Sequence, residues 1–146
     1  MPDEHRDSSR NAIQARLALE DVCSGAQLDR VADYYQPDFV DHVNGKTYHG
    51  HQGVRESVHI YQRILTDLRF EVVQQITEGD NVVSRFIVHG TNRGRRIQLT
   101  GIVISRLQEG RIVEDFAVTD TVELLRQLGW WRTLLLVVTQ PRVLRH

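Results

Sequence analysis

The first half of the chain carries apolar residues at helical spacing. From about Ser9 to Cys23 they recur among charged residues, and Gly25 supplies a stop signal. A shorter helix is predicted from about Leu28 to Tyr35, ahead of Pro37. A longer amphipathic helix is predicted to begin between Gly50 and Gly53. The apolar stripe of this third helix consists of Val54, Val58, Tyr61, Ile64 and Leu65.

After Leu68 the pattern changes from helical to alternating, which predicts β-strands. Short Gly-containing turns separate the alternating segments, as in antiparallel hairpins. A final helix is predicted from about Asp120 to Leu128, with Asp120 as its N-cap and Gly129 after its end. The predicted strands cover residues 70–76, 82–89 (ending at Gly90), 97–107 and 112–118, and a short extended segment covers 39–43.

Helices followed by a meander of strands indicate an α+β fold in which the helices cover one face of a curved antiparallel sheet. A sheet bent around its helices leaves a cavity between the two layers. The 146 residues fit a single domain. We therefore expect a disordered N-terminus over residues 1–8, one domain over 9–129 and a C-terminal extension over 130–146.

Composition excludes several classes of protein. The formal net charge of −1 argues against a nucleic-acid partner. Cys23 is the only cysteine, so neither an internal disulfide nor a cysteine-based metal cluster can form. The N-terminus lacks the apolar segment of a secretory signal, and the run Leu134 to Val138 is too short to span a membrane. Lys46 is the only lysine among 18 basic residues, a bias typical of a GC-rich bacterial genome. These features predict a soluble, cytoplasmic bacterial protein.

Four segments of the chain resemble SnoaL-like polyketide cyclases, a family of the nuclear transport factor 2-like superfamily. They are similar to that family's signatures in order and spacing, over roughly residues 12–129. The resemblance implies a cone-shaped α+β barrel, in which a curved antiparallel sheet packs on N-terminal helices around an apolar pocket. The four segments are Tyr34–His42, His89–Gly94, Glu109–Glu114 and Arg126–Gly129.

The same resemblance implies a chemistry. SnoaL-type cyclases close a ring of an aromatic polyketide ester by an intramolecular aldol condensation, without metal or cofactor. Their acid/base residue is an Asp directly before a Trp on the last long strand, and the matching pair here is Asp115 and Phe116. This chain departs from the family at three positions. It has Asn92 and Val103 where the cyclases carry His, and Val22 where they can carry a pocket Tyr.

Asp115 is also the leading catalytic candidate on physical grounds. Its alternate neighbours Val113 and Ala117 are apolar, which predicts that their shared face points inward. A carboxyl group held against apolar walls has a raised pKa and can act as a general acid and base near neutral pH. The competing interpretation is a structural ion pair between Asp115 and an arginine of the adjacent strand, such as Arg106.

His89 is the second catalytic candidate, because it precedes Gly90 at a predicted strand end and could relay a proton to Asp115. A surface position for His89 is an equally open interpretation. A metal site is not predicted, because the spacing of Asp38, Asp41 and His42, with His49 and His51 nearby, matches no established ligand motif. The predicted pocket residues are Tyr35, His42, Tyr61, Phe116 and Asn92.

The sequence thus predicts a cofactor-free polyketide cyclase, or a related ring-forming enzyme of antibiotic biosynthesis, acting on a small hydrophobic polyketide-derived substrate. Two alternatives remain open: a SnoaL-like polyketide hydroxylase component that works with a reductase, and a small-molecule binding protein without catalysis. Trp130, Trp131 and the apolar run that follows predict burial of the C-terminal extension against the domain or a partner. We therefore expect a homodimer.

Overall fold

Helices occupy much of the first half of the chain in this computed structural model, which describes residues 2–129. The first helix continues into a π-helix, and a 3-10 turn leads into the short second helix. The helices are α1 (Pro2–Leu17), the π-helix η1 (Ala18–Cys23), the 3-10 helix η2 (Leu28–Arg30), α2 (Val31–Tyr34), α3 (Gly50–Ile64) and α4 (Thr121–Leu128). Six strands form one sheet: β1 (Tyr35–Val43), β2 (Lys46–His49), β3 (Thr66–Glu78), β4 (Asn81–Asn92), β5 (Arg95–Gln108) and β6 (Arg111–Thr119).

The sheet has the strand order β2-β1-β6-β5-β4-β3. Four of its pairings are antiparallel, as the hairpin pattern predicts, but β1 and β6 run parallel, so the sheet is mixed rather than antiparallel throughout. The reason lies in the connection: between β1 and β6 the chain passes through α3 and four further strands, and this long crossover brings β6 back beside β1 in the same direction. Parallel pairing aligns residues far apart in sequence.

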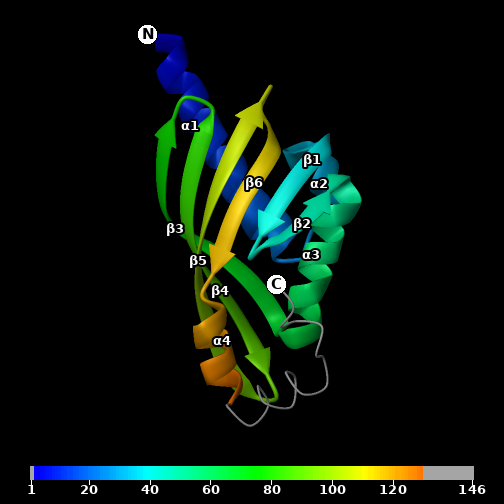
Figure 1. Cartoon of the computed structure of the whole chain (residues 1–146). Coiled ribbons are helices and arrows are strands. Elements are labelled where there is room, and N and C mark those ends of the chain that lie inside the picture. The colour runs from blue at the N-terminus through cyan, green and yellow to red at the C-terminus, as the bar shows by residue number, and fades with distance from the viewer. Residues whose placement is uncertain (1, 130–146) are drawn as a thin grey trace.

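The sheet curves around the helices in a cone that remains open along one side (Figure 1). Figure 1 shows α1 and α3 on the same side of the sheet, with α4 below the end of β6. Apolar side chains of the covered face are buried beneath these helices. The α+β cone is therefore the architecture that the pattern and the family resemblance predict. No helix among the described residues is both long and apolar enough to traverse a membrane.

Several boundaries differ from the prediction. Helix α1 begins at Pro2, whereas helix was predicted only from about Ser9 and disorder over residues 1–8. The first residues have few apolar positions and hence no periodic signal, yet their backbone continues the helix. Strand β4 runs through Gly90 to Asn92, and a Cβ at Gly90 would clash with the Leu65 side chain. Glycine here permits close packing against Leu65 and does not end the strand. The predictions for residues 130–146 lie outside the described residues.

One local prediction at the end of an element is confirmed. The Asp120 side chain caps α4 by accepting a hydrogen bond from the Glu123 amide at 2.9 Å. Asn44 and Gly45 form the tight turn between β1 and β2, both with positive φ. Strand β2 itself was not predicted, because four residues are too few to show alternation.

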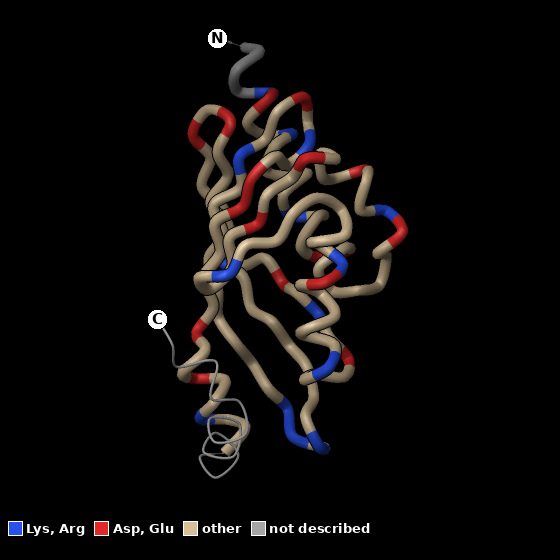
Figure 2. Tube along the Cα trace, turned by 45° about the vertical axis from the view of Figure 1, so that its right-hand side comes forward, with Lys and Arg blue, Asp and Glu red and all other residues tan. Residues whose placement is uncertain are grey.

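Opposite charges mark the two ends of the long strands (Figure 2). The β3–β4 turn carries Glu78 and Asp80, whereas Arg93, Arg95 and Arg96 lie at the β4–β5 turn. The side chains that face the helices are mostly apolar, with a small number of buried polar exceptions. Two of these exceptions are carboxylic acids, and they define the candidate site.

Candidate active site

A cavity lies between the helices and the sheet, and its walls are mainly apolar. It contains about 540 Å³ of empty space, counting the part open to solvent. The lining residues are Leu19, Cys23, Tyr35, Phe39, Asp41, Val43, Val54, Ser57, Val58, Tyr61, Phe70, Phe86, Val103, Asp115, Ala117 and Thr119.

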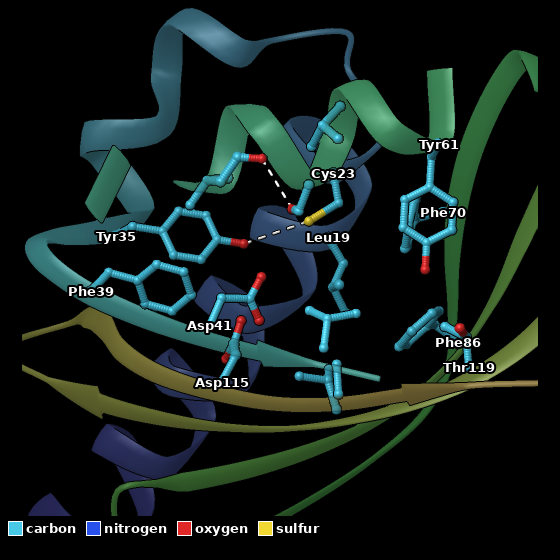
Figure 3. Close-up of a pocket in the computed structure, with 16 residues that line it drawn as sticks. Leu19, Cys23, Tyr35, Phe39, Asp41, Tyr61, Phe70, Phe86, Asp115 and Thr119 are labelled. Atoms are coloured by element: carbon cyan, nitrogen blue, oxygen red, sulfur yellow. Dashed lines mark hydrogen bonds between the residues drawn. The ribbon is translucent and has the colours of Figure 1, made fainter. Parts of the chain in front are cut away.

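Two carboxyl groups enter this cavity side by side, Asp41 from β1 and Asp115 from β6 (Figure 3). The parallel pairing of the two strands places Asp41 directly opposite Asp115 in the register. Adjacent strands lie about 4.8 Å apart, so the two side chains project from neighbouring positions on one face. Both residues are buried, with 8% and 7% of their surface exposed. The acid pair, as we call Asp41 and Asp115, is the polar centre of an apolar cavity.

Irregular pairing in both strands puts the acids on this face. The register shifts between Arg106 and Leu107 on the β5–β6 ladder, where β6 carries the extra residue Val113. Ile112 and Asp115 are therefore the buried positions, and Val113 turns to the other face, contrary to the strict alternation predicted around Asp115. The predicted inward orientation of Asp115 and Ala117 is confirmed.

The pKa values of both acids are raised. Burial raises the pKa of Asp41 to about 7. The pKa of Asp115 lies well above its ordinary value, mainly because of burial and then because of the negative charge of Asp41, while a hydrogen bond with Ser105 acts in the opposite direction. Two adjacent buried carboxyl groups resist ionising together. Near neutral pH the pair therefore holds at least one proton.

Within residues 2–129, Asp115 has no basic partner. Arg106, the alternative considered for an ion pair, reaches Glu114 at 3.4 Å instead. None of the described residues that line the cavity is basic. One carboxyl oxygen of Asp115, Oδ1, is buried without a hydrogen-bond partner among the described residues. An unsatisfied buried polar atom costs about 1–3 kcal/mol and calls for an explanation, such as a ligand group that it would bind.

Tyr35 and Cys23 close the end of the cavity beside the acid pair. The Tyr35 hydroxyl lies 3.6 Å from the Cys23 sulfur (Figure 3). Burial raises the pKa of the Cys23 thiol to about 12 and that of the Tyr35 hydroxyl well above its ordinary value. Both groups stay protonated at physiological pH, so they can donate hydrogen bonds but cannot serve as thiolate or phenolate nucleophiles. Cys23 reaches this position at the end of the π-helix, a form of helix frequent at functional sites.

Two of the five predicted pocket residues, Tyr35 and Tyr61, line the cavity. The others lie elsewhere. Phe116 is 51% exposed and its ring stacks on His42 at 4.5 Å, because it neighbours Asp115 on the strand and so points to the opposite face. Asn92 donates a hydrogen bond to the Ile64 carbonyl at the end of α3, at 2.7 Å.

The structure does not bring His89 to Asp115. His89 alternates with Phe86 and Val88, whose side chains are buried, and so projects from the other face of β4. There its Nε2 lies 2.7 Å from a carboxylate oxygen of Glu71, and its Nδ1 lies 3.3 Å from the Gln98 amide. The surface interpretation of this histidine therefore describes its position, and β4 keeps its regular pairing with β5 through His89 and Gly90.

From the sequence, Asp41 was considered for a metal site, and His42 was expected in the pocket. Instead both belong to β1, where Asp41 is buried in the cavity and His42 faces Glu114 at 3.4 Å. The signal was present in the alternation of Phe39, Asp41 and Val43, since an acid flanked by apolar residues two positions away shares their face. No group of three or more His, Cys, Asp or Glu side chains among the described residues is arranged to hold a metal ion.

Comparison with known proteins identifies the family. The family model for SnoaL-like polyketide cyclases matches residues 13–128, and the chain belongs to this family. A comparison with curated protein sequences gives no match.

Solved structures share the fold. A loop-truncated variant of IdmH is 26% identical, with a TM-score of 0.73, and the match covers 82% of this chain and 99% of that one. Wild-type IdmH of Streptomyces antibioticus, described as a candidate polyketide cyclase, is 25% identical, with a TM-score of 0.69 over 79% and 94% of the two chains. A candidate polyketide cyclase of Bacillus cereus is 21% identical, with a TM-score of 0.77 over 88% and 87%.

Proposed function

We propose that this protein is a cofactor-free cyclase that closes a ring in a small polyketide-derived ketone, with Asp41 and Asp115 as its general base and general acid. The observation that carries the proposal is the position of the two acids, opposite each other in an apolar cavity, with Asp115 Oδ1 unpartnered among the described residues. Family membership and the likeness to IdmH support ring closure as the reaction.

The two acids differ in a way that suits them to opposite tasks. Asp41 has a pKa of about 7, so near neutral pH a substantial fraction is ionised and can accept a proton from carbon. Asp115 is deeper and feels the charge of Asp41, so it stays protonated and can donate a hydrogen bond to a carbonyl oxygen. The ionised Asp41 favours a protonated Asp115, and the protonated Asp115 leaves Asp41 free to ionise. Each acid therefore holds its neighbour in the state that the neighbour's function requires.

The proposed reaction is an aldol addition within one molecule. The Asp41 carboxylate removes a proton from the carbon next to one carbonyl, and the enolate carbon attacks a second carbonyl carbon of the same chain. As that carbon–carbon bond forms, the second carbonyl's π electrons move to its oxygen, which takes the proton of Asp115. Return of the proton from Asp41 to Asp115 restores the starting state. The atoms balance without an oxidant, a reductant or a metal.

Apolar walls contribute by excluding water from the acids and by shaping the bound chain. Phe39 and Tyr35 pack at 4.7 Å beside the acid pair, and Tyr61 and Phe70 meet edge to face at 5.6 Å farther along the cavity (Figure 3). Such rings favour flat or folded carbon chains, and a chain held with its reacting atoms in contact needs less ordering in the transition state.

Proton exchange tests the acid pair without the natural substrate. We expect the protein to speed deuterium incorporation next to the carbonyl of 2-tetralone in D₂O, followed by proton NMR. Asp41→Asn and Asp115→Asn should each lower the protein-catalysed rate by about 10²-fold, since general acid–base catalysis contributes on that order. Glu114→Gln is the matched control, because Glu114 adjoins Asp115 but faces the outside of the sheet, and it should keep the full rate.

A full rate in both Asn variants would contradict the proposal. Binding of the ketone with no exchange above buffer would instead support the non-catalytic binding protein. The hydroxylase alternative predicts a different product: with a reductase and ¹⁸O₂ present, an oxygen-18 label would enter the substrate, whereas the cyclase adds no oxygen from O₂.

A further inference from the structure

A second hollow adjoins the acid cavity and shares its outer lining. Both hollows are bounded by Val43, Ser57, Tyr61 and Thr119. The outer hollow has about 680 Å³ of empty space, counting the part open to solvent, and continues toward α4, where Leu124 forms part of its wall. In Figure 3, Tyr61 and Thr119 lie at the end of the cavity away from Asp41 and Asp115. The two hollows therefore lie end to end, with these four residues between them.

Lys46 stands at the edge of this outer hollow. It is the only lysine in the chain, it is exposed, and it has no ion-pair partner among the described residues. On the β1–β2 ladder it lies opposite Val43, so the two side chains share a face, and Val43 lines both hollows. The Lys46 side chain, which has no ion-pair partner among the described residues, thus borders the outer hollow.

Side-chain hydrogen bonds hold the turn that carries Lys46. Asn44 donates to the Thr119 hydroxyl at 2.8 Å, and its side-chain oxygen accepts from the Thr119 amide at 2.9 Å. The Asn44 amide also donates to the Ala117 carbonyl at 3.1 Å. These bonds fix the β1–β2 turn against the end of β6, so the base of the Lys46 side chain has a set position relative to the cavity.

From these positions we infer that the substrate is an elongated keto acid, held with its reacting carbonyl at the acid pair and its carboxylate at Lys46. The acids disfavour an anion at the inner end, and the lysine favours one at the outer end, so charge fixes the direction of binding. The role of the inner end rests on the proposed function, whereas the outer anion site does not.

Strand geometry gives the spacing between the two ends. Val43 lies two residues beyond Asp41 along β1, which is about 7 Å, and Lys46 lies one strand farther out, about 5 Å to the side. The reacting carbonyl and the carboxylate should therefore be on the order of 10 Å apart, with the flexible lysine side chain allowing a few ångströms more.

Binding of ω-benzoylalkanoic acids tests the inference. Dissociation constants of a series with increasing chain length, and of the matching methyl esters, would be measured by calorimetry at low salt. We expect the acid to bind about twofold to fivefold tighter than its ester once the ketone and the carboxylate are on the order of 10 Å apart, the range for an exposed ion pair. Lys46→Gln should abolish this preference, Lys46→Arg should keep it, and Arg93→Gln at the β4–β5 turn should leave it unchanged.

Equal binding of acids and esters at every chain length would overturn the inference, as would a preference that survives Lys46→Gln. The readout is an affinity ratio and needs no turnover. A lost preference with normal proton exchange therefore refutes the Lys46 site alone, whereas a normal preference without exchange refutes the proposed catalysis alone.

Discussion

At the scale of single residues, the site depends on the pH at which two carboxyl groups lose their protons. Asp41 and Asp115 are buried against Phe39, Tyr35 and other apolar side chains, and burial favours the neutral form of each acid. Each ionised acid would also repel charge on the other. The same burial that suits the pair to acid–base chemistry must therefore weaken the fold whenever the pair is forced to ionise.

The pH dependence of stability shows this cost. An acid whose pKa is raised in the folded state holds more protons than the unfolded chain, so the free energy of unfolding falls as the pH rises from about 4 through the folded pKa. Asp115→Asn removes one of the two buried acids and, with it, the free-energy cost of ionising that acid at high pH. We expect this variant to match the wild type near pH 4 and to exceed it by about 1–3 kcal/mol at pH 8.

Urea denaturation at several pH values measures this difference. Glu114→Gln, on the opposite face of the same strand, should show no such growth with pH. A constant difference between wild type and Asp115→Asn from pH 4 to pH 8 would mean that Asp115 is not strained by ionisation in the folded state.

At the scale of elements, periodicity predicted what depends on local pattern. Helix α3, the hairpins of β3 to β6 and the Asp120 cap of α4 follow from apolar spacing, glycine-containing turns and a capping side chain. The inward face of Asp115 follows in the same way. Features set by distant parts of the chain were missed: the parallel pairing of β1 with β6 depends on a crossover, and so does the meeting of Asp41 with Asp115.

The remaining errors at this scale also have physical causes. Strict alternation placed Val113 beside Asp115, and an extra residue in β6 shifts it to the other face. Gly90 suggested a strand end, but it makes room for Leu65 within β4, which continues to Asn92 with His89 on its outer face. One sequence shows that a glycine is present, not whether it ends a strand or permits close packing.

At the scale of the whole molecule, the outer face of the sheet carries a patch of exposed apolar side chains. Ile102 pairs with Val118 and Ile104 with Phe116 across β5 and β6, and all four are at least 42% exposed. A contiguous apolar patch is typical of an interface. Charges of both signs, on Arg106 and Glu114, border it, so a second copy related by a twofold axis could meet opposite charges.

We therefore expect a homodimer that buries this patch. Light scattering after size exclusion should give twice the chain mass, and Phe116→Glu should shift the mass to that of the monomer, because it would bury an unpaired charge. Ile76→Glu, an exposed position near the end of β3, is the control and should leave the dimer intact. A monomeric wild type at micromolar concentration would contradict this expectation.

The proposed catalysis requires that the acid pair transfer protons in the cavity. The pH dependence of 2-tetralone deuteration tests it most directly. We expect the rate to rise as the pH passes about 7, where Asp41 ionises, and to fall at higher pH as the pair loses its remaining proton. Asp115→Asn should remove the falling limb. A rate that is flat from pH 5 to pH 9, or that rises with a midpoint near pH 4, would contradict proton transfer by the acid pair.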